Sequence, residues 1–133
     1  MIKGVTFSSW DLLHSGHIAM LEESKSQCDY LIVGLQTDPT IDRPNKNKPV
    51  QTTFERYIQL KGCKFVDEII PYDTEEDVVN FLQTVKPDIR FIGEEYRGTE
   101  FSGNKLPIQM IFTSRRHNFS TSSLRKRIQN AKI

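Results

Sequence analysis

The sequence is poor in cysteine, in long apolar runs and in excess charge, and each shortage excludes a class of protein. Two cysteines among 133 residues are too few for a disulfide scaffold, and their spacing does not suggest a metal site. No apolar run approaches the roughly 20 residues that a membrane helix needs, so we expect no membrane insertion. The net charge of +1 argues against a general binder of nucleic acid. The N-terminus shows no secretory signal pattern, which predicts a cytoplasmic protein with reduced thiols.

The composition that remains is that of one globular domain. Hydrophobic residues make up 37% of the chain and charged residues 26%, which is ordinary for a folded soluble protein. This length suits a single core, so we expect one domain over residues 1–133. Cations gather locally within residues 43–48 and 115–127. Two basic patches on a nearly neutral protein favour a phosphorylated small molecule as ligand.

Apolar stretches alternate with helical patterns along the chain. Strands are predicted at 2–7, 29–35, 66–71, 88–93 and 107–113, and helices at 18–28, 52–62, 74–85 and from about 120. The alternation predicts an α/β fold, a doubly wound, five-stranded parallel sheet of Rossmann-like type. Ligands of such sheets bind beyond the carboxyl ends of the strands, where the strand order reverses. We therefore expect the turns after the first, fourth and fifth strands to meet at one edge.

The turn after the first predicted strand holds two histidines three residues apart, His14 and His17, with Gly16 between them. This turn opens a helix, and the free N–H groups and dipole of a helix start favour a bound phosphate. Imidazoles placed there can donate hydrogen bonds or protons to a phosphoryl group. The alternative is a helix cap or a surface pair. A zinc site would need further ligands, and the sequence offers no obvious third or fourth one.

Three other segments carry groups suited to phosphate. Residues 36–51 form a long polar loop, in which Lys46 and Lys48 can close over a phosphate or simply face solvent. Arg56 follows a capping box in the first helical turn, where a cation opposes the helix dipole and suggests a bound anion. The hydroxyls of residues 120–123 can cap a helix or accept a phosphate.

Several motifs resemble the cytidylyltransferase-like nucleotidyltransferases. They are Asp-Leu-Leu-His-Ser-Gly-His from Asp11, Glu-Arg-Tyr-Ile-Gln-Leu-Lys from Glu55, Phe-Val-Asp-Glu-Ile-Ile-Pro from Phe65 and Ser-Thr-Ser-Ser from Ser120. The resemblance covers nearly the whole chain, and in size and segment order it is strongest to the glycerol-3-phosphate cytidylyltransferases. It implies that a small phosphorylated alcohol, such as glycerol 3-phosphate, attacks the α-phosphorus of CTP and releases pyrophosphate. It also implies Mg²⁺ on the triphosphate, no confident metal ligand from the protein, and a homodimer.

The resemblance further implies which residues form the site. The catalytic residues would be His14, His17, Lys46 and Arg115. Nucleotide contacts are implied for Thr6, Phe7, Ser8, Ser9, Trp10, Asp11, Gly16, Lys48, Gly93, Glu95, Ser120 and Thr121. Arg56 and Lys64 would contact the phosphate of the acceptor, and Asp11 would orient the histidine motif or assist the metal.

The sequence departs from the cytidylyltransferase pattern in three segments. Ser8 replaces a glycine, Gly93-Glu-Glu-Tyr96 replaces Gly-Asp-Asp-Trp, and residues 115–121 read Arg-Arg-His-Asn-Phe-Ser-Thr in place of Arg-Thr-x-Gly-Ile-Ser-Thr. The ending from Ser120 to Arg125 also resembles adenylyltransferases of the same superfamily. Two alternatives therefore stand beside the CTP-dependent enzyme. One is an adenylyltransferase that uses ATP with a different acceptor, and the other is a nucleotide-binding module without catalysis.

Overall fold

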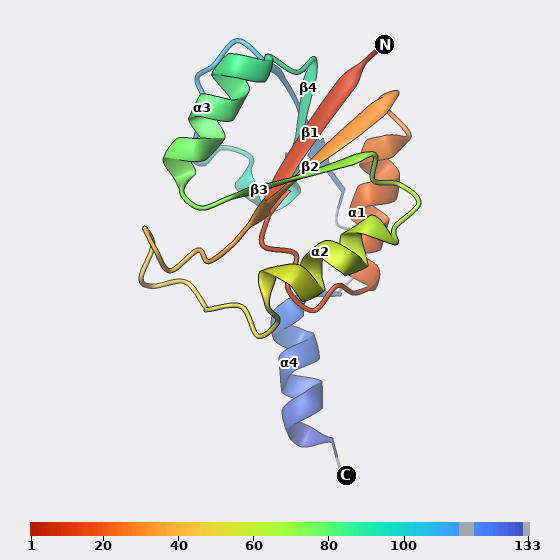
Figure 1. The fold of residues 1–133 in the computed structure, drawn as a ribbon, viewed down its shortest axis with the longest axis vertical. Helices are drawn as coiled ribbons and strands as arrows, with labels where there is room; N and C mark the ends of the chain where they lie inside the picture. The colour runs from red at the N-terminus through yellow and green to blue at the C-terminus, as the bar shows by residue number, and fades with distance from the viewer. Residues whose placement is uncertain (115–118, 132–133) are drawn as a thin grey trace.

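The computed structural model describes residues 1–114 and 119–131. Strands and helices alternate along these residues, with a short 3₁₀ helix, η1, after the fourth strand (Figure 1). The elements are β1 (Lys3–Ser8), α1 (Ser15–Lys25), β2 (Tyr30–Gln36), α2 (Thr53–Lys61), β3 (Glu68–Tyr72), α3 (Glu75–Val85), β4 (Ile89–Gly93), η1 (Glu94–Tyr96), β5 (Gln109–Thr113) and α4 (Thr121–Asn130).

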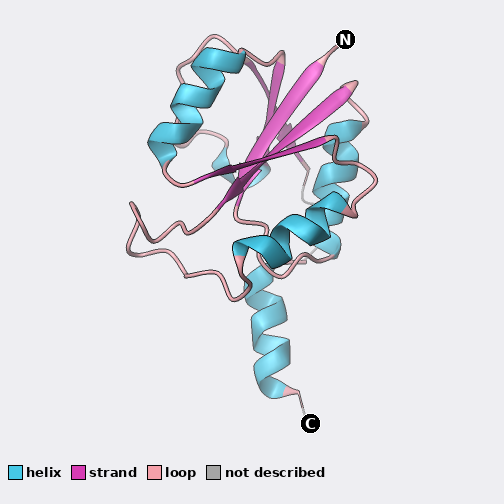
Figure 2. Cartoon of the chain, viewed as in Figure 1, coloured by secondary structure: helices cyan, strands magenta, loops and turns pink. Residues whose placement is uncertain are grey.

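The strands form one five-stranded sheet in the order β3-β2-β1-β4-β5. Figure 2 shows the strands in magenta with helices in cyan beside them. Every neighbouring pair is parallel, which confirms the fold class predicted from the alternating pattern. The chain winds outward from β1 to β3 and then returns to place β4 on the other side of β1. The strand order therefore reverses between β1 and β4, and this is where a parallel α/β sheet opens its binding crevice.

Helices cover both faces of the sheet, as Figure 1 shows. Leu31 and Val33 of β2 pack in one core cluster with Leu21 of α1, while the intervening Ile32 packs with Val78 of α3. Successive side chains of a strand point to opposite faces, so a strand buried on both sides reads as a continuous apolar run. The apolar stretch predicted as a buried central strand is therefore confirmed.

Most element boundaries differ from the sequence prediction by one to three residues, and two of these differences have a clear local reason. Helix α1 begins at Ser15 because His14 and His17 form a reciprocal capping box across its first turn. Strand β3 continues through Pro71 to Tyr72. It lies at the edge of the sheet, so the missing N–H of Pro71 costs no ladder hydrogen bond.

Helix α4 projects away from the body of the domain, and its described residues include no buried side chain (Figure 1). None of the helices formed by residues 1–114 and 119–131 is long and apolar enough to cross a membrane. Cys28 and Cys63 are both free thiols and partly buried, as expected.

Candidate active site

A cleft of about 680 Å³ lies beyond the carboxyl ends of β1, β4 and β5. Its wall includes the histidine turn after β1, Gly93 and Glu95 after β4, and the start of α4 after β5. The loop between β2 and α2 adds Lys46 to the same wall. The expected meeting of three phosphate-suited turns at one edge of the sheet is therefore confirmed. The volume lies within the usual range for small-molecule sites.

The turn between β1 and α1 has a strained backbone. Trp10 and Leu12 adopt φ angles of 55° and 51°, which are uncommon for residues other than glycine. Two hydrogen bonds hold this conformation, from Trp10 Nε1 to Gly34 O at 2.9 Å and from Leu12 N to Gln51 Oε1 at 2.8 Å. Such strain persists where surrounding structure enforces it. The two histidines are thus presented by a turn whose shape is fixed before any ligand binds.

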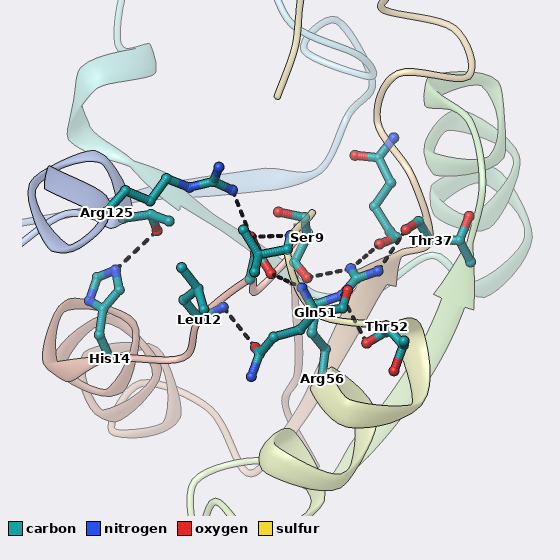
Figure 3. Close-up of polar contacts among 12 residues, drawn as sticks. Ser9, Leu12, His14, Thr37, Gln51, Thr52, Arg56 and Arg125 are labelled. Carbon is teal, nitrogen blue, oxygen red and sulfur yellow. Dashed lines mark hydrogen bonds and ion pairs between the residues drawn. The ribbon is translucent and has the colours of Figure 1, made fainter. Parts of the chain in front are cut away.

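Asp11 connects this turn to the segment before α2 and to helix α4. Its buried carboxylate accepts hydrogen bonds from Val50 N at 2.9 Å and Gln51 N at 3.0 Å. It also pairs with the Arg125 guanidinium of α4 at 2.8 Å (Figure 3). Both carboxylate oxygens are therefore occupied by protein donors. This geometry favours the orienting role for Asp11 over direct assistance to a metal ion.

Arg56 has a different environment from the one expected of a phosphate ligand. Its guanidinium is buried and donates to main-chain carbonyls, to Ser9 O at 2.8 Å, Gln36 O at 2.6 Å and Thr37 O at 2.6 Å (Figure 3). The anion inferred from its place in the first turn of α2 is replaced by these oxygens. We therefore correct the interpretation of Arg56: the side chain joins the β1 turn to the end of β2.

His14 is the N-cap of α1 and contacts α4 as well. Its Nδ1 accepts a hydrogen bond from Gly16 N at 3.0 Å, which leaves the proton of a neutral ring on Nε2. Nε2 lies 3.1 Å from Thr121 Oγ1 in the first turn of α4 (Figure 3). One imidazole thus bridges the N-terminal ends of two helices, where positive dipole ends and free N–H groups converge.

His17 is held beside His14 in a largely buried position. Its Nδ1 accepts from His14 N at 3.2 Å, and the two ring centroids are 4.0 Å apart. Burial, and then the neighbouring His14, lower the pKa of His17 to about 3. The ring is therefore neutral near pH 7, with its proton on Nε2. A neutral imidazole of this kind can donate a hydrogen bond to a phosphoryl oxygen without first losing a proton.

The start of α4 forms the opposite side of the phosphate region. Ser120 caps the helix by accepting a hydrogen bond from Ser123 N at 3.0 Å, and no acidic residue occupies the first turn. Ser120 and Thr121 both line the cleft. No acidic side chain offsets the positive dipole end of this helix, and its first turn carries hydroxyl groups. It is therefore a suitable position for the outer phosphates of a triphosphate.

Most of the residues predicted for the site lie in the cleft. Those that line it are Thr6, Phe7, Ser8, Ser9, Trp10, Asp11, His14, Gly16, His17, Lys46, Gly93, Glu95, Ser120 and Thr121. Lys48, Arg56 and Lys64 are not among its lining residues, and Lys64 lies over the Phe65 ring at 5.2 Å. Arg115 falls outside the described residues. The roles assigned to Lys48, Lys64 and Arg115 stay predictions.

Sequence reasoning missed a further group of polar side chains in the cleft. These are Arg43, Tyr72, Glu75, Arg90 and Arg125. Arg90 left a signal, because it is the charged residue in the middle of an otherwise apolar strand. Arg43 was noted only as part of the basic patch of residues 43–48, and Glu75 left no comparable signal, since it lies in a polar segment where a solvent-exposed charge is ordinary.

A parallel α/β domain with paired histidines at a helix start and a phosphate-suited cleft defines a nucleotidyltransferase. The chain belongs to the family described as Cytidylyltransferase-like, which it matches over residues 5–127. The family expected from the motifs is therefore confirmed.

Known relatives place the chain more closely within this family. It is 31% identical to the bifunctional protein HldE of Campylobacter concisus and 32% identical to that of Campylobacter jejuni, in each case over 98% of the chain. The chain spans 28% and 29% of the lengths of these two relatives. They carry the name HldE and not glycerol-3-phosphate cytidylyltransferase.

Solved structures share the fold of this chain. The lipopolysaccharide core biosynthesis protein of Thermoplasma volcanium is 30% identical, with a TM-score of 0.72 over 88% of this chain and 99% of its own. The pantothenate synthetase of Thermus thermophilus has a TM-score of 0.63 at 13% identity, over 95% of this chain and 64% of its own. This second likeness shows a shared fold.

Gly16→Ala is expected to disturb catalysis without unfolding the domain. A Cβ at this position would lie 2.8 Å from His14 Cε1 and 3.1 Å from Phe119 Cβ, so the His14 ring must move. We expect kcat to fall by about tenfold or more, because a misplaced catalytic group is costly. The free energy of unfolding should change by less than about 1 kcal/mol.

Gly62→Ala is the matched control, because its added Cβ would meet nothing closer than 3.6 Å and its φ is −78°. Steady-state kinetics and thermal unfolding of both variants provide the comparison. Equal kcat values for Gly16→Ala and Gly62→Ala would contradict the role given to the position of His14.

Proposed function

We propose that the protein transfers AMP from ATP to the phosphate of a small phosphorylated sugar or alcohol and releases pyrophosphate. The observation that carries this proposal is the convergence of the α1 and α4 N-termini at His14, beside the neutral His17. Two helix starts and two imidazoles at one end of a cleft provide donors for several phosphate groups at once.

The reaction needs positioning and charge stabilisation more than it needs a base. A phosphate monoester is already anionic near neutral pH, so its oxygen attacks the α-phosphorus directly while the bond to pyrophosphate breaks. His17 Nε2–H and Lys46 would stabilise the charge that develops on the α-phosphoryl oxygens. The α4 start, with Ser120 and Thr121, would hold the departing β- and γ-phosphates.

Mg²⁺ would enter this site bound to the triphosphate. Among the described residues, no group of three His, Cys, Asp or Glu side chains is arranged to hold a metal ion. The cation would therefore take most of its ligands from phosphate and water oxygens, as Mg²⁺ commonly does. Its chemistry there is to bridge phosphate oxygens and to shield their charge.

The choice of ATP over CTP rests on the end of the chain. The run from Ser120 to Arg125 resembles the adenylyltransferase ending, and Arg125 lines the cleft while paired with Asp11. The departures of Ser8 and Gly93–Tyr96 from the cytidylyltransferase pattern leave the nucleotide and the acceptor open. CTP with glycerol 3-phosphate, favoured by overall size and segment order, remains the second candidate pair.

A sugar phosphate is favoured as acceptor by one relative. The Thermoplasma volcanium protein is named for lipopolysaccharide core biosynthesis, and that core is a carbohydrate. A nucleotide-activated sugar is the type of product that such a role requires. The homodimer and the cytoplasmic location expected from the sequence stay predictions, and sedimentation at low concentration would test the first.

Pyrophosphate release tests this proposal. ATP or CTP with Mg²⁺ would be combined with a panel of sugar phosphates and glycerol 3-phosphate. We expect ATP with a sugar phosphate to react at least about tenfold faster than CTP, which corresponds to about 1.4 kcal/mol of discrimination. Preference for CTP and glycerol 3-phosphate would establish the second pair. Tight nucleotide binding without pyrophosphate from any pair would indicate a binding module.

A further inference from the structure

A buried arginine lines the cleft away from the histidine turn. Arg90 lies in β4, directly opposite Val5 of β1, and 5% of its surface is exposed. Its guanidinium carbon is 5.2 Å from the Phe7 ring centroid and 5.1 Å from that of Phe101. Both rings lie within cation–π distance of the guanidinium, and the side chain reaches from the sheet into the cleft.

Arg90 lacks the partners that a buried cation normally has. Its Nη1 donates to Ser102 O, and its buried Nε has no hydrogen-bond partner among the described residues. Within that same part of the chain no carboxylate forms an ion pair with Arg90. A guanidinium carries five N–H donors and cannot give up its proton to escape the cost of burial. Buried charges are usually paired with an opposite charge, and an anion from outside the chain would supply that partner.

The residues around Arg90 do not neutralise its positive charge through an ion pair. Glu75, the nearby carboxylate on α3, is already engaged by Arg43 at 2.7 Å. Arg43 Nη2 also donates to Gln36 Oε1 at 2.9 Å. Gly103 lets the loop after η1 lie against Arg90, because a Cβ there would be 3.2 Å from Arg90 Nη1. The Glu75 carboxylate is therefore shared with Arg43, and among the described residues no carboxylate forms an ion pair with Arg90.

We propose that Arg90 binds the phosphate of the acceptor substrate. This inference rests on the proposed nucleotidyl transfer and adds a positioning role for a residue in the middle of a strand. Arg43 and Glu75 beside it offer a guanidinium and a carboxylate to the hydroxyl groups of a polyhydroxylated acceptor. The subsite is thus suited to a sugar phosphate rather than to a bare phosphate ester.

The position of Arg90 assigns it to the acceptor and not to the triphosphate. Its neighbours Phe7 and Tyr72 belong to the cluster packed under α3, on the other face of the sheet from α1. The triphosphate groups are expected at the starts of α1 and α4. Both regions open into the same cleft, so a phosphate held at Arg90 and a triphosphate held at the two helix starts would share it.

Arg90→Met tests the inference, because methionine keeps most of the side-chain length and removes the charge. Inorganic phosphate would be titrated calorimetrically into the protein, alone and with a non-hydrolysable ATP analogue present. We expect the Kd for phosphate to rise at least about tenfold in Arg90→Met and less in Arg90→Lys. Arg127→Met, an exposed arginine on α4, is the matched control and should bind phosphate within about twofold of the unaltered protein.

Arg90→Met removes a buried charge that forms no ion pair and also one hydrogen bond to Ser102 O, so we expect these two effects on stability to offset each other in part. A Tm close to that of the unaltered protein would show that any loss of binding is not loss of folding. In steady-state kinetics the KM for the acceptor should rise at least about thirtyfold, with the KM for ATP within about threefold. Unchanged phosphate affinity, undetectable phosphate binding by the unaltered protein, or a rise confined to the KM for ATP would each overturn the inference. A lowered phosphate affinity in a protein that never releases pyrophosphate would instead reject the proposed function alone.

Discussion

His17→Ala is expected to lower kcat by about 10²–10⁴-fold while the protein stays folded. The Nδ1 of this ring is used by His14 N, so its catalytic group is the Nε2 proton. Because burial keeps the ring neutral, that proton can strengthen its hydrogen bond as charge develops on the α-phosphoryl oxygens. An interaction that is stronger in the transition state than in the ground state appears in kcat.

A second substitution separates catalysis from helix capping. His17→Gln places a residue suited to the capping box at the same position and so can keep the bond to His14 N, while it removes the imidazole. We expect His17→Gln to unfold at nearly the same temperature as the unaltered protein and still to lose most of its turnover. Ser26→Ala, at the exposed far end of α1, is the control for substitution in this helix. Turnover within a factor of three in both His17 variants would remove the imidazole from the mechanism.

Arg56→Met is expected to destabilise the protein by about 3–5 kcal/mol, because several buried carbonyls lose their donor at about 1–3 kcal/mol each. The substitution would leave the carbonyls of Ser9, Gln36 and Thr37 without their donor. Buried acceptors without partners carry a desolvation cost that packing does not recover. Arg56 would then no longer connect the β1 turn to the end of β2 and the start of α2.

Urea unfolding of Arg56→Met and Lys61→Met measures this effect. Lys61 is an exposed cation in the last turn of the same helix, so its substitution should change the free energy of unfolding by less than about 0.5 kcal/mol. A stable Arg56→Met with a raised acceptor KM would restore the phosphate-binding role expected from the sequence and contradict the structural one.

The fold and the centre of the site were predictable from local signals. The period of the apolar residues, the caps and the continuous apolar strand around Val33 are read directly from neighbouring residues. His14 and His17 were predictable because a short turn between a strand and a helix leaves few places for them to point. The edge at which three turns meet followed from the rule for parallel sheets.

The remaining features depend on contacts between residues far apart in the chain. Arg56 looked like an anion ligand because its helix position is unfavourable for a cation, and only the folded chain brings carbonyl oxygens to it. In the sequence, Arg90 is recognisable as a charged residue within an apolar strand. Its lack of a carboxylate partner can be seen only in the folded structure. Local sequence rules specify elements, whereas pairing across the sheet decides what a charged side chain does.

The most direct test of the account is ³¹P NMR of a reaction that contains the protein, ATP, Mg²⁺ and a sugar phosphate. The account predicts the resonances of a new diphosphate linkage together with free pyrophosphate, because the acceptor attacks the α-phosphorus. Transfer of the terminal phosphate, seen as ADP and no new mixed diphosphate, would contradict attack at that atom. So would the absence of any new resonance for every acceptor and for both ATP and CTP.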